Sequence, residues 1–190
     1  MLVEFPFFAA GVNYFPGEIS ALRVFEPRYL LLIGDSIVKS KNFLVGRNIE
    51  EYGQIVSEVE ILEHQDISNA EQVVVVECKK LYKVKEISTD HEYPLCIVSE
   101  HNDVGLPPDI NELDILEKKI IKMTAKLIEQ GLNITIPEFV IDIDNRINKL
   151  WELCIYTPMD LETKNYILNQ NENFKRYETL LNYVNSILNA

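Results

Sequence analysis

The sequence has few of the residues that build disulfide-linked or metal-stabilised folds. Its 190 residues include three cysteines, three histidines and one tryptophan. Cys78, Cys96 and Cys154 lie far apart in apolar contexts and form no C-x-x-C pair, which predicts reduced, buried thiols and a cytoplasmic protein. The histidines lie in polar, loop-like segments without the spacing of metal ligands, so we expect neither a metal nor a cofactor.

Long hydrophobic runs are also missing. No stretch approaches the roughly 18 apolar residues of a membrane-spanning helix, so we expect no membrane partner. The first eight residues, M-L-V-E-F-P-F-F, include Glu4 and lack the basic region of a signal peptide. The hydrophobic content of 47% is ordinary for a globular protein, and a chain of this length can bury a substantial core without disulfides or metals.

Positive charge is scarce in both halves of the chain. The net charge is −12, and residues 1–104 carry 9 Lys and Arg against 17 Asp and Glu. Residues 105–190 carry 9 against 13, so neither half has the excess of cations that binds nucleic-acid phosphates. The one basic cluster, K-K-L-Y-K-V-K at 79–85, alternates with apolar residues, which is typical of the solvated face of a strand.

The first hundred residues predict mainly strands. Several short runs are rich in valine and isoleucine, and in some of them every second residue is apolar, which indicates one wet face. Polar turns such as D-I-S-N-A-E connect them, as in an antiparallel sheet or a small barrel. The runs are 43–47, 54–62, 72–78, 81–87 and 94–99.

One helix should interrupt these strands, beginning at the segment E-P-R-Y. Pro27 suits the first helical position, because its fixed φ and missing N–H cost nothing there. Glu26 places a negative charge at the positive end of the helix.

From Asn111 onward the pattern becomes helical. Asn111 is the expected cap of the first helix in this region, and Asp160 the expected cap of a short later one. G-L-P-P-D at 105–109 continues neither strand nor helix, so we predict a β-rich subdomain at 1–104 and an α-helical subdomain at 105–190. The last helix should bury a stripe at alternating spacings of three and four residues, made by Phe174, Tyr177, Leu181, Val184 and Leu188.

Two segments carry a resemblance to a known family. F-P-G-E at 15–18, followed by L-R-V-F-E-P-R-Y-L at 22–30, resembles the start of the stand-alone Lon substrate-binding domain. P-M-D-L-E-T-K-N-Y-I-L and R-Y-E-T-L-L near the other end also resemble that family. The chain is a divergent member, because Ser20 and Ala21 stand where the family usually has Leu-Pro, and E-C-K-K-L-Y-K-V lacks a glycine of the family's G-R-R-F-R-V segment.

The resemblance implies an α+β fold, with a PUA-like antiparallel β pseudo-barrel containing one inserted helix, followed by a helical bundle. It also implies a role in recruiting unfolded or tagged proteins, with a protease as a candidate partner. The separate ATPase and Ser-Lys protease domains of the full protease are absent, and no G-x-x-x-x-G-K-[ST] segment occurs. The resemblance therefore supports a binding module in protein turnover or quality control and does not support an enzyme.

Three charged residues lie among the apolar residues of the opening motif. Glu26 can accept bidentate hydrogen bonds from a guanidinium, so Arg23, Glu26 and Arg28 are predicted to form a half-buried structural clamp between strand and helix. Alternatively, one of the two arginines is exposed and binds a carboxylate or carbonyl of a peptide. No nucleophile or second acid accompanies them, so a catalytic role ranks last. The candidate peptide-binding residues are Tyr14, Phe15, Arg23, Arg28 and Tyr29.

Three classes of function remain open on the sequence. A module that binds unfolded proteins or peptides is favoured, a PUA-like RNA-binding protein is the alternative, and a small hydrolase ranks last. The acidic balance argues against RNA. The ligand and the oligomeric state are left open.

Overall fold

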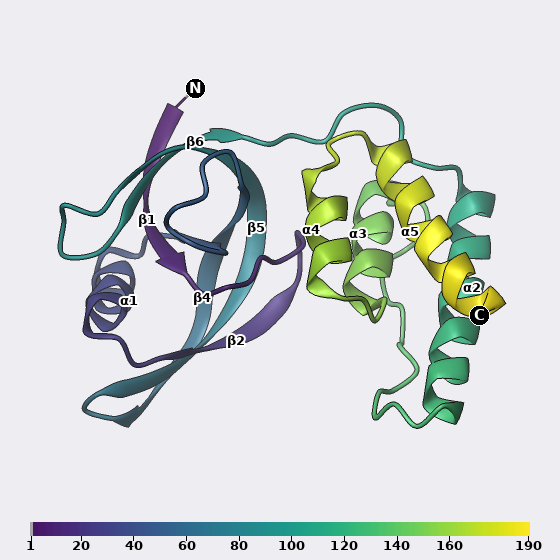
Figure 1. The fold of residues 1–190 in the computed structure, drawn as a ribbon, viewed down its shortest axis with the longest axis horizontal. Helices are drawn as coiled ribbons and strands as arrows, with labels where there is room; N and C mark the ends of the chain where they lie inside the picture. Colours follow the sequence, from purple (N-terminus) through teal and green to yellow (C-terminus); the bar gives the residue numbers. More distant parts are fainter. Residues whose placement is uncertain (1) are drawn as a thin grey trace. The chain divides into compact units, whose positions relative to one another are not determined.

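The computed structural model describes residues 2–190. Contacts divide the chain into two units, Met1–Asn102 (unit 1) and Asp103–Ala190 (unit 2), shown in Figure 1. Unit 1 contains the strands and one helix, and unit 2 contains the remaining helices. The predicted α+β class, with a β-rich part followed by a helical part, is confirmed.

The five predicted apolar runs form strands of unit 1, with one merger, and strands at Leu2–Ala9 and Ile19–Val24 precede them. The runs at 72–78 and 81–87 form a single long strand, because no glycine or proline separates them. The elements are β1 (Leu2–Ala9), β2 (Ile19–Val24), α1 (Pro27–Lys39), β3 (Phe43–Gly46), β4 (Ile55–Ser68), β5 (Glu71–Ser88) and β6 (Leu95–Glu100).

The sheet of unit 1 closes on itself. The strand order is β2-β5-β4-β3-β1-β6, and β6 also pairs with β5. The long strand β5 makes this possible: its second half pairs with β6, and its first half pairs with β2. Among the strands in residues 2–190, β2 is paired along one edge only, with β5, and its other edge has no partner strand.

One pairing differs from the predicted antiparallel arrangement. β1 and β3 are parallel, with Phe7 opposite Leu44 and Phe8 opposite Val45. A parallel pair needs a long crossover connection, and the segment containing β2 and α1 provides it. In Figure 1, α1 lies beside the curled sheet, where it contacts β1.

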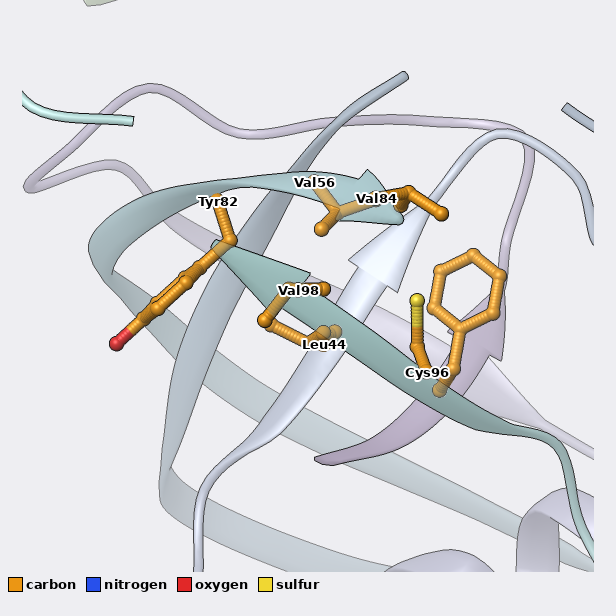
Figure 2. Close-up of a cluster of buried hydrophobic side chains, with 7 residues drawn as sticks. Leu44, Val56, Tyr82, Val84, Cys96 and Val98 are labelled. Atoms are coloured by element: carbon orange, nitrogen blue, oxygen red, sulfur yellow. The ribbon is translucent and has the colours of Figure 1, made fainter. Parts of the chain in front are cut away.

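The barrel interior is filled by side chains from five strands. Phe7, Leu44, Val56, Tyr82, Val84, Cys96 and Val98 form one buried cluster. Figure 2 shows the Tyr82 hydroxyl directed away from the other side chains of this cluster. Gly46 is required beside it, since a Cβ there would lie 2.6 Å from the Phe7 ring and 2.8 Å from the Val56 side chain.

Unit 2 is a set of packed helices. α2 contacts α3 and α5, and α5 also contacts α3 and α4. Asp160 caps α4 as predicted, accepting a hydrogen bond from the Thr163 amide at 2.7 Å. The cap of α2 is Asp109 rather than Asn111, because Glu112 completes a reciprocal capping box with Asp109. The helices are α2 (Ile110–Glu129), α3 (Arg146–Tyr156), α4 (Leu161–Asn169) and α5 (Asn173–Asn189).

Candidate functional site

The F-P-G-E segment forms a tight turn that leads into β2. The Glu18 amide donates to the Phe15 carbonyl at 2.9 Å, and the Phe15 amide donates to the Glu18 carboxylate at 2.8 Å. Gly17 has φ +84°, which a type II turn requires at its third position and which a side chain would strain. Pro16 supplies the fixed φ of the second position. The turn therefore sets where β2 begins.

One backbone hydrogen bond shows which backbone groups of β2 face β5. The Cys78 amide donates to the Glu18 carbonyl at 3.0 Å, and the register of the ladder then runs from Ile19 opposite Glu77 to Val24 opposite Gln72. Backbone groups of an antiparallel strand alternate between its two edges. Ser20, Leu22 and Val24 therefore direct their amides and carbonyls toward β5, and the residues between them direct theirs away from it.

Side chains of β2 alternate as well. Leu22 and Val24 are buried, whereas Ile19 is 60% exposed and Ala21 and Arg23 are also exposed. Phe25, which follows the strand, is 62% exposed. The outer edge of β2 therefore combines unpaired backbone groups with apolar side chains and one arginine, and we call Ile19, Ala21 and Arg23 together the β2 edge.

The predicted three-residue clamp is not formed. Arg23 makes its ion pair with Glu71 at the start of β5, and its side chain is 72% exposed. Arg28 pairs with Glu26 at 2.9 Å, with both side chains more than 40% exposed. The Glu26–Arg28 part of the prediction is confirmed as a contact. Arg23 does not take part in this contact, because its guanidinium pairs with the carboxylate of Glu71 across the β2–β5 ladder.

The three aromatic candidates are core residues. Tyr14, Phe15 and Tyr29 are 5%, 1% and 1% exposed. The Tyr14 amide donates to the Ser57 hydroxyl at 2.8 Å, and burial raises the pKa of the Tyr14 phenol. Side chains so buried cannot touch a peptide in this conformation, so we assign them to packing. Of the five candidate binding residues, Arg23 and Arg28 are exposed.

Tyr29 shows how the start of α1 is held. Its ring packs on Phe8 of β1 with centroids 4.2 Å apart, and its hydroxyl accepts a hydrogen bond from the Ala9 amide at 3.3 Å. Burial raises the pKa of the Tyr29 phenol. The Arg28 guanidinium lies 4.6 Å from the centroid of the Tyr29 ring. Tyr29, rather than an ion pair, therefore joins the helix to the barrel.

A surface hollow of about 520 Å³ lies near the C-terminal end of α1. Asp35 lines it, and its carboxylate accepts hydrogen bonds from Lys39 at 2.5 Å and from the Tyr93 hydroxyl at 2.9 Å. The hydrogen bond from Lys39, and to a smaller extent that from Tyr93, holds the pKa of Asp35 below its usual range. The carboxylate of Asp35 is satisfied by these two neighbours, which makes the hollow a weaker candidate than the β2 edge.

Within residues 2–190, possible metal ligands are scattered and the thiols are buried. No group of three or more His, Cys, Asp or Glu side chains in that range is placed to hold a metal ion. The three cysteines are free and buried, and burial raises the pKa of Cys96 and of Cys154 to about 12. Thiols of that kind stay protonated at neutral pH and are poor nucleophiles. None of the helices described there is long and apolar enough to span a membrane.

A buried arginine in unit 2 is absent from the residues predicted to matter. Arg176 of α5 is fully buried and donates to Asp103 at 2.8 Å and to the Gln170 carbonyl at 2.6 Å. Its guanidinium lies 3.8 Å from the centroid of the Trp151 ring. The buried side of α5 includes Arg176, Tyr177, Leu180 and Val184, whereas Phe174 of the predicted stripe is 44% exposed. The R-Y-E-T-L-L segment was the available signal.

Comparisons with known proteins agree with this architecture. The family model described as the ATP-dependent protease La (LON) substrate-binding domain matches residues 4–186. A Lon N-terminal domain protein from Xanthomonas campestris is similar in structure, with a TM-score of 0.70 and 22% identity, over 95% of this chain and 98% of that one. The N-terminal domain of a Mycobacterium avium complex Lon protease gives 0.71 and 14%, over 96% and 98%. Among curated proteins, no match is found.

Proposed function

Because the chain belongs to the family of the ATP-dependent protease La (LON) substrate-binding domain, we propose that it is a non-catalytic module that binds unfolded polypeptides and acts as an adaptor in protein turnover. The match over residues 4–186 is the observation that carries this proposal. A protease that degrades the bound polypeptide is the proposed partner. The free, buried thiols are consistent with a reducing compartment such as the cytoplasm.

The surface chemistry supports binding of protein over RNA. The net charge of −12 opposes the approach of a phosphate backbone. The exposed arginines Arg23 and Arg28 are each already paired with a carboxylate, which reduces their attraction for phosphate. Exposed apolar groups such as Phe25 and Ile19 instead offer contacts to the apolar side chains of an unfolded chain.

Fluorescence anisotropy with the full chain tests the proposal. The probe is fluorescein-labelled α-lactalbumin that has been reduced and carboxymethylated, and the matched control is the same protein in its native, disulfide-bonded state. We expect saturable binding of the unfolded probe and at least about tenfold weaker binding of the native one. A labelled 20-nucleotide poly(U) is measured in parallel at two salt concentrations. Equal affinity for unfolded and native protein, or tight, salt-sensitive binding of the RNA, would refute the proposed function.

A further inference from the structure

The outer edge of β2 leaves a row of backbone groups available for pairing. The phase set by the Cys78–Glu18 hydrogen bond directs the amides and carbonyls of Ile19, Ala21 and Arg23 away from β5. No strand in residues 2–190 pairs with this edge. Unpaired edges are sites where another extended chain can add as a further strand.

The side chains beside this edge indicate what kind of strand would fit. Ile19 and Ala21 are exposed on the outer face, where Ala21 lies opposite the partly buried Val75 of β5 and Ile19 lies opposite Glu77. A strand added to β2 would place every second side chain against this apolar strip, because side chains alternate between faces. Apolar residues at alternate positions are therefore the expected pattern of the bound segment.

The charges around the edge indicate the flanks of that segment. Residues 60–79, which form the hairpin part of β4 and β5 beside β2, carry five acidic side chains and one lysine. Arg23 and Glu71 neutralise each other, as do Arg28 and Glu26, which leaves four acidic side chains and one lysine in the hairpin part. A segment with basic residues at its ends complements this surface.

Ala21 lies at the middle of this edge, and its amide is directed outward. A proline there lacks the outward amide and would close the edge to an added strand, as prolines commonly do on edge strands. Alanine keeps the donor, so the edge stays open at this position.

We propose that the β2 edge binds an extended segment of an unfolded polypeptide by strand addition, with alternating apolar residues and basic flanks. This proposal rests on the proposed function and specifies how the polypeptide is held. Backbone hydrogen bonds provide affinity that depends little on sequence. The exposed apolar side chains of β2 and the acidic hairpin part provide the preference for apolar residues with basic flanks.

Two substitutions of Ala21 in the full chain test the proposal. Ala21→Pro removes the outward amide and leaves the hydrogen bonds to β5 in place, and Ala21→Val keeps the amide and adds bulk that suits a strand. The probe is a fluorescein-labelled nonapeptide, Lys-Lys-Val-Thr-Val-Thr-Val-Lys-Lys. We expect Ala21→Pro to raise its Kd at least about tenfold and Ala21→Val to change it less than about twofold.

A second experiment uses only the parent protein, so its result does not depend on whether the variants fold. The same peptide with methyl groups on the amide nitrogens of its central Thr-Val-Thr loses donors from both edges, and we expect the parent protein to bind it at least about tenfold more weakly. A peptide with glutamate in place of its four lysines should also bind more weakly. Equal binding of the methylated and unmethylated peptides, or equal binding by Ala21→Pro and the parent, would overturn strand addition.

The carboxymethylated α-lactalbumin probe separates failure of this mode from failure of the function. If the parent and Ala21→Pro bind that probe equally well, the function stands and the β2 edge is excluded. If the parent binds neither this probe nor the peptide, both proposals fail. If Ala21→Pro loses both ligands while its thermal melt matches that of the parent, both are supported.

Discussion

The two units of the molecule differ in whether they bury charged side chains. In unit 1, among residues 2–102, the buried polar side chains are uncharged: Asn13, Ser36, Gln54 and Ser57. In unit 2, Lys149, Glu152 and Arg176 are each at most 3% exposed. The sequence predicts a half-buried ion-pair clamp at the strand-to-helix junction of unit 1, yet the buried guanidinium of the described residues occurs in unit 2.

The difference follows from which groups form hydrogen bonds with the backbone amides and carbonyls of each unit. Sheet ladders pair most backbone groups of unit 1. Unit 2 has an irregular segment between α2 and α3, and its backbone groups need other partners. The Glu152 carboxylate accepts from the amides of Val140 and Ile141 at 2.7 and 2.9 Å. Arg176 likewise donates to the carbonyl of Gln170, just outside α5. Buried charges in unit 2 therefore hold loops in place.

Lys149 completes one of these networks. Its ammonium group lies 2.6 Å from Glu117 and 2.9 Å from Glu152. Burial alone lowers the pKa of Lys149, but the hydrogen bonds to the two carboxylates outweigh burial, so the pKa is raised. The lysine therefore stays charged, as a buried pair requires.

The largest expected effect is in unit 2. Asp103→Ala leaves the fully buried Arg176 without its carboxylate partner, and we expect a loss of about 3 kcal/mol in the free energy of unfolding. Urea unfolding followed by the fluorescence of Trp151, the only tryptophan, reports on this network directly. A loss below about 1 kcal/mol would show that Asn173, Gln170 and Trp151 suffice for Arg176, and would remove the contrast between the units.

An effect that is smaller per pH unit should appear in both units at alkaline pH. The thiols of Cys96 in unit 1 and Cys154 in unit 2 have a pKa raised by burial to about 12, against an ordinary value of 9.0. Between these values the unfolded chain releases the proton and the folded chain keeps it. The free energy of unfolding should therefore fall from pH 9 to 12, by roughly 1 kcal/mol per pH unit for each thiol.

Urea midpoints measured at pH 8, 9, 10 and 11 test this expectation. The variant carrying Cys96→Ala and Cys154→Ala serves as the control and should show a shallower fall across the same range. A midpoint that stays constant above pH 9 in the parent would contradict the buried, protonated state of the two thiols.

The smallest effect is expected at the junction of unit 1. Glu26→Ala removes an ion pair in which both partners are more than 40% exposed, and we expect a loss of no more than about 1 kcal/mol. Thermal melts of this variant and Asp103→Ala, recorded side by side, compare the two units. A loss near that of Asp103→Ala would mean that the surface pair acts as the structural clamp originally predicted.

Sequence patterns predicted best those features that depend on neighbours in the chain. Pro27 begins α1 and Asp160 caps α4, because a first-turn proline and a capping carboxylate act within a few residues. The buried side of α5 was predicted less well. Hydrophobicity alone favoured Phe174 over Arg176, whereas the partners of Arg176 make its burial favourable.

The sequence by itself determined the order of elements, the division into strands and then helices, and the family motif, since periodicity and turn chemistry are local. Only the tertiary structure decided which charges are paired and which are buried. Arg23 meets Glu71 48 residues away, and Arg176 meets Asp103 73 residues away. Such pairings depend on the register of a sheet and the packing of helices, which no local pattern encodes. The same register leaves the outer edge of β2 open.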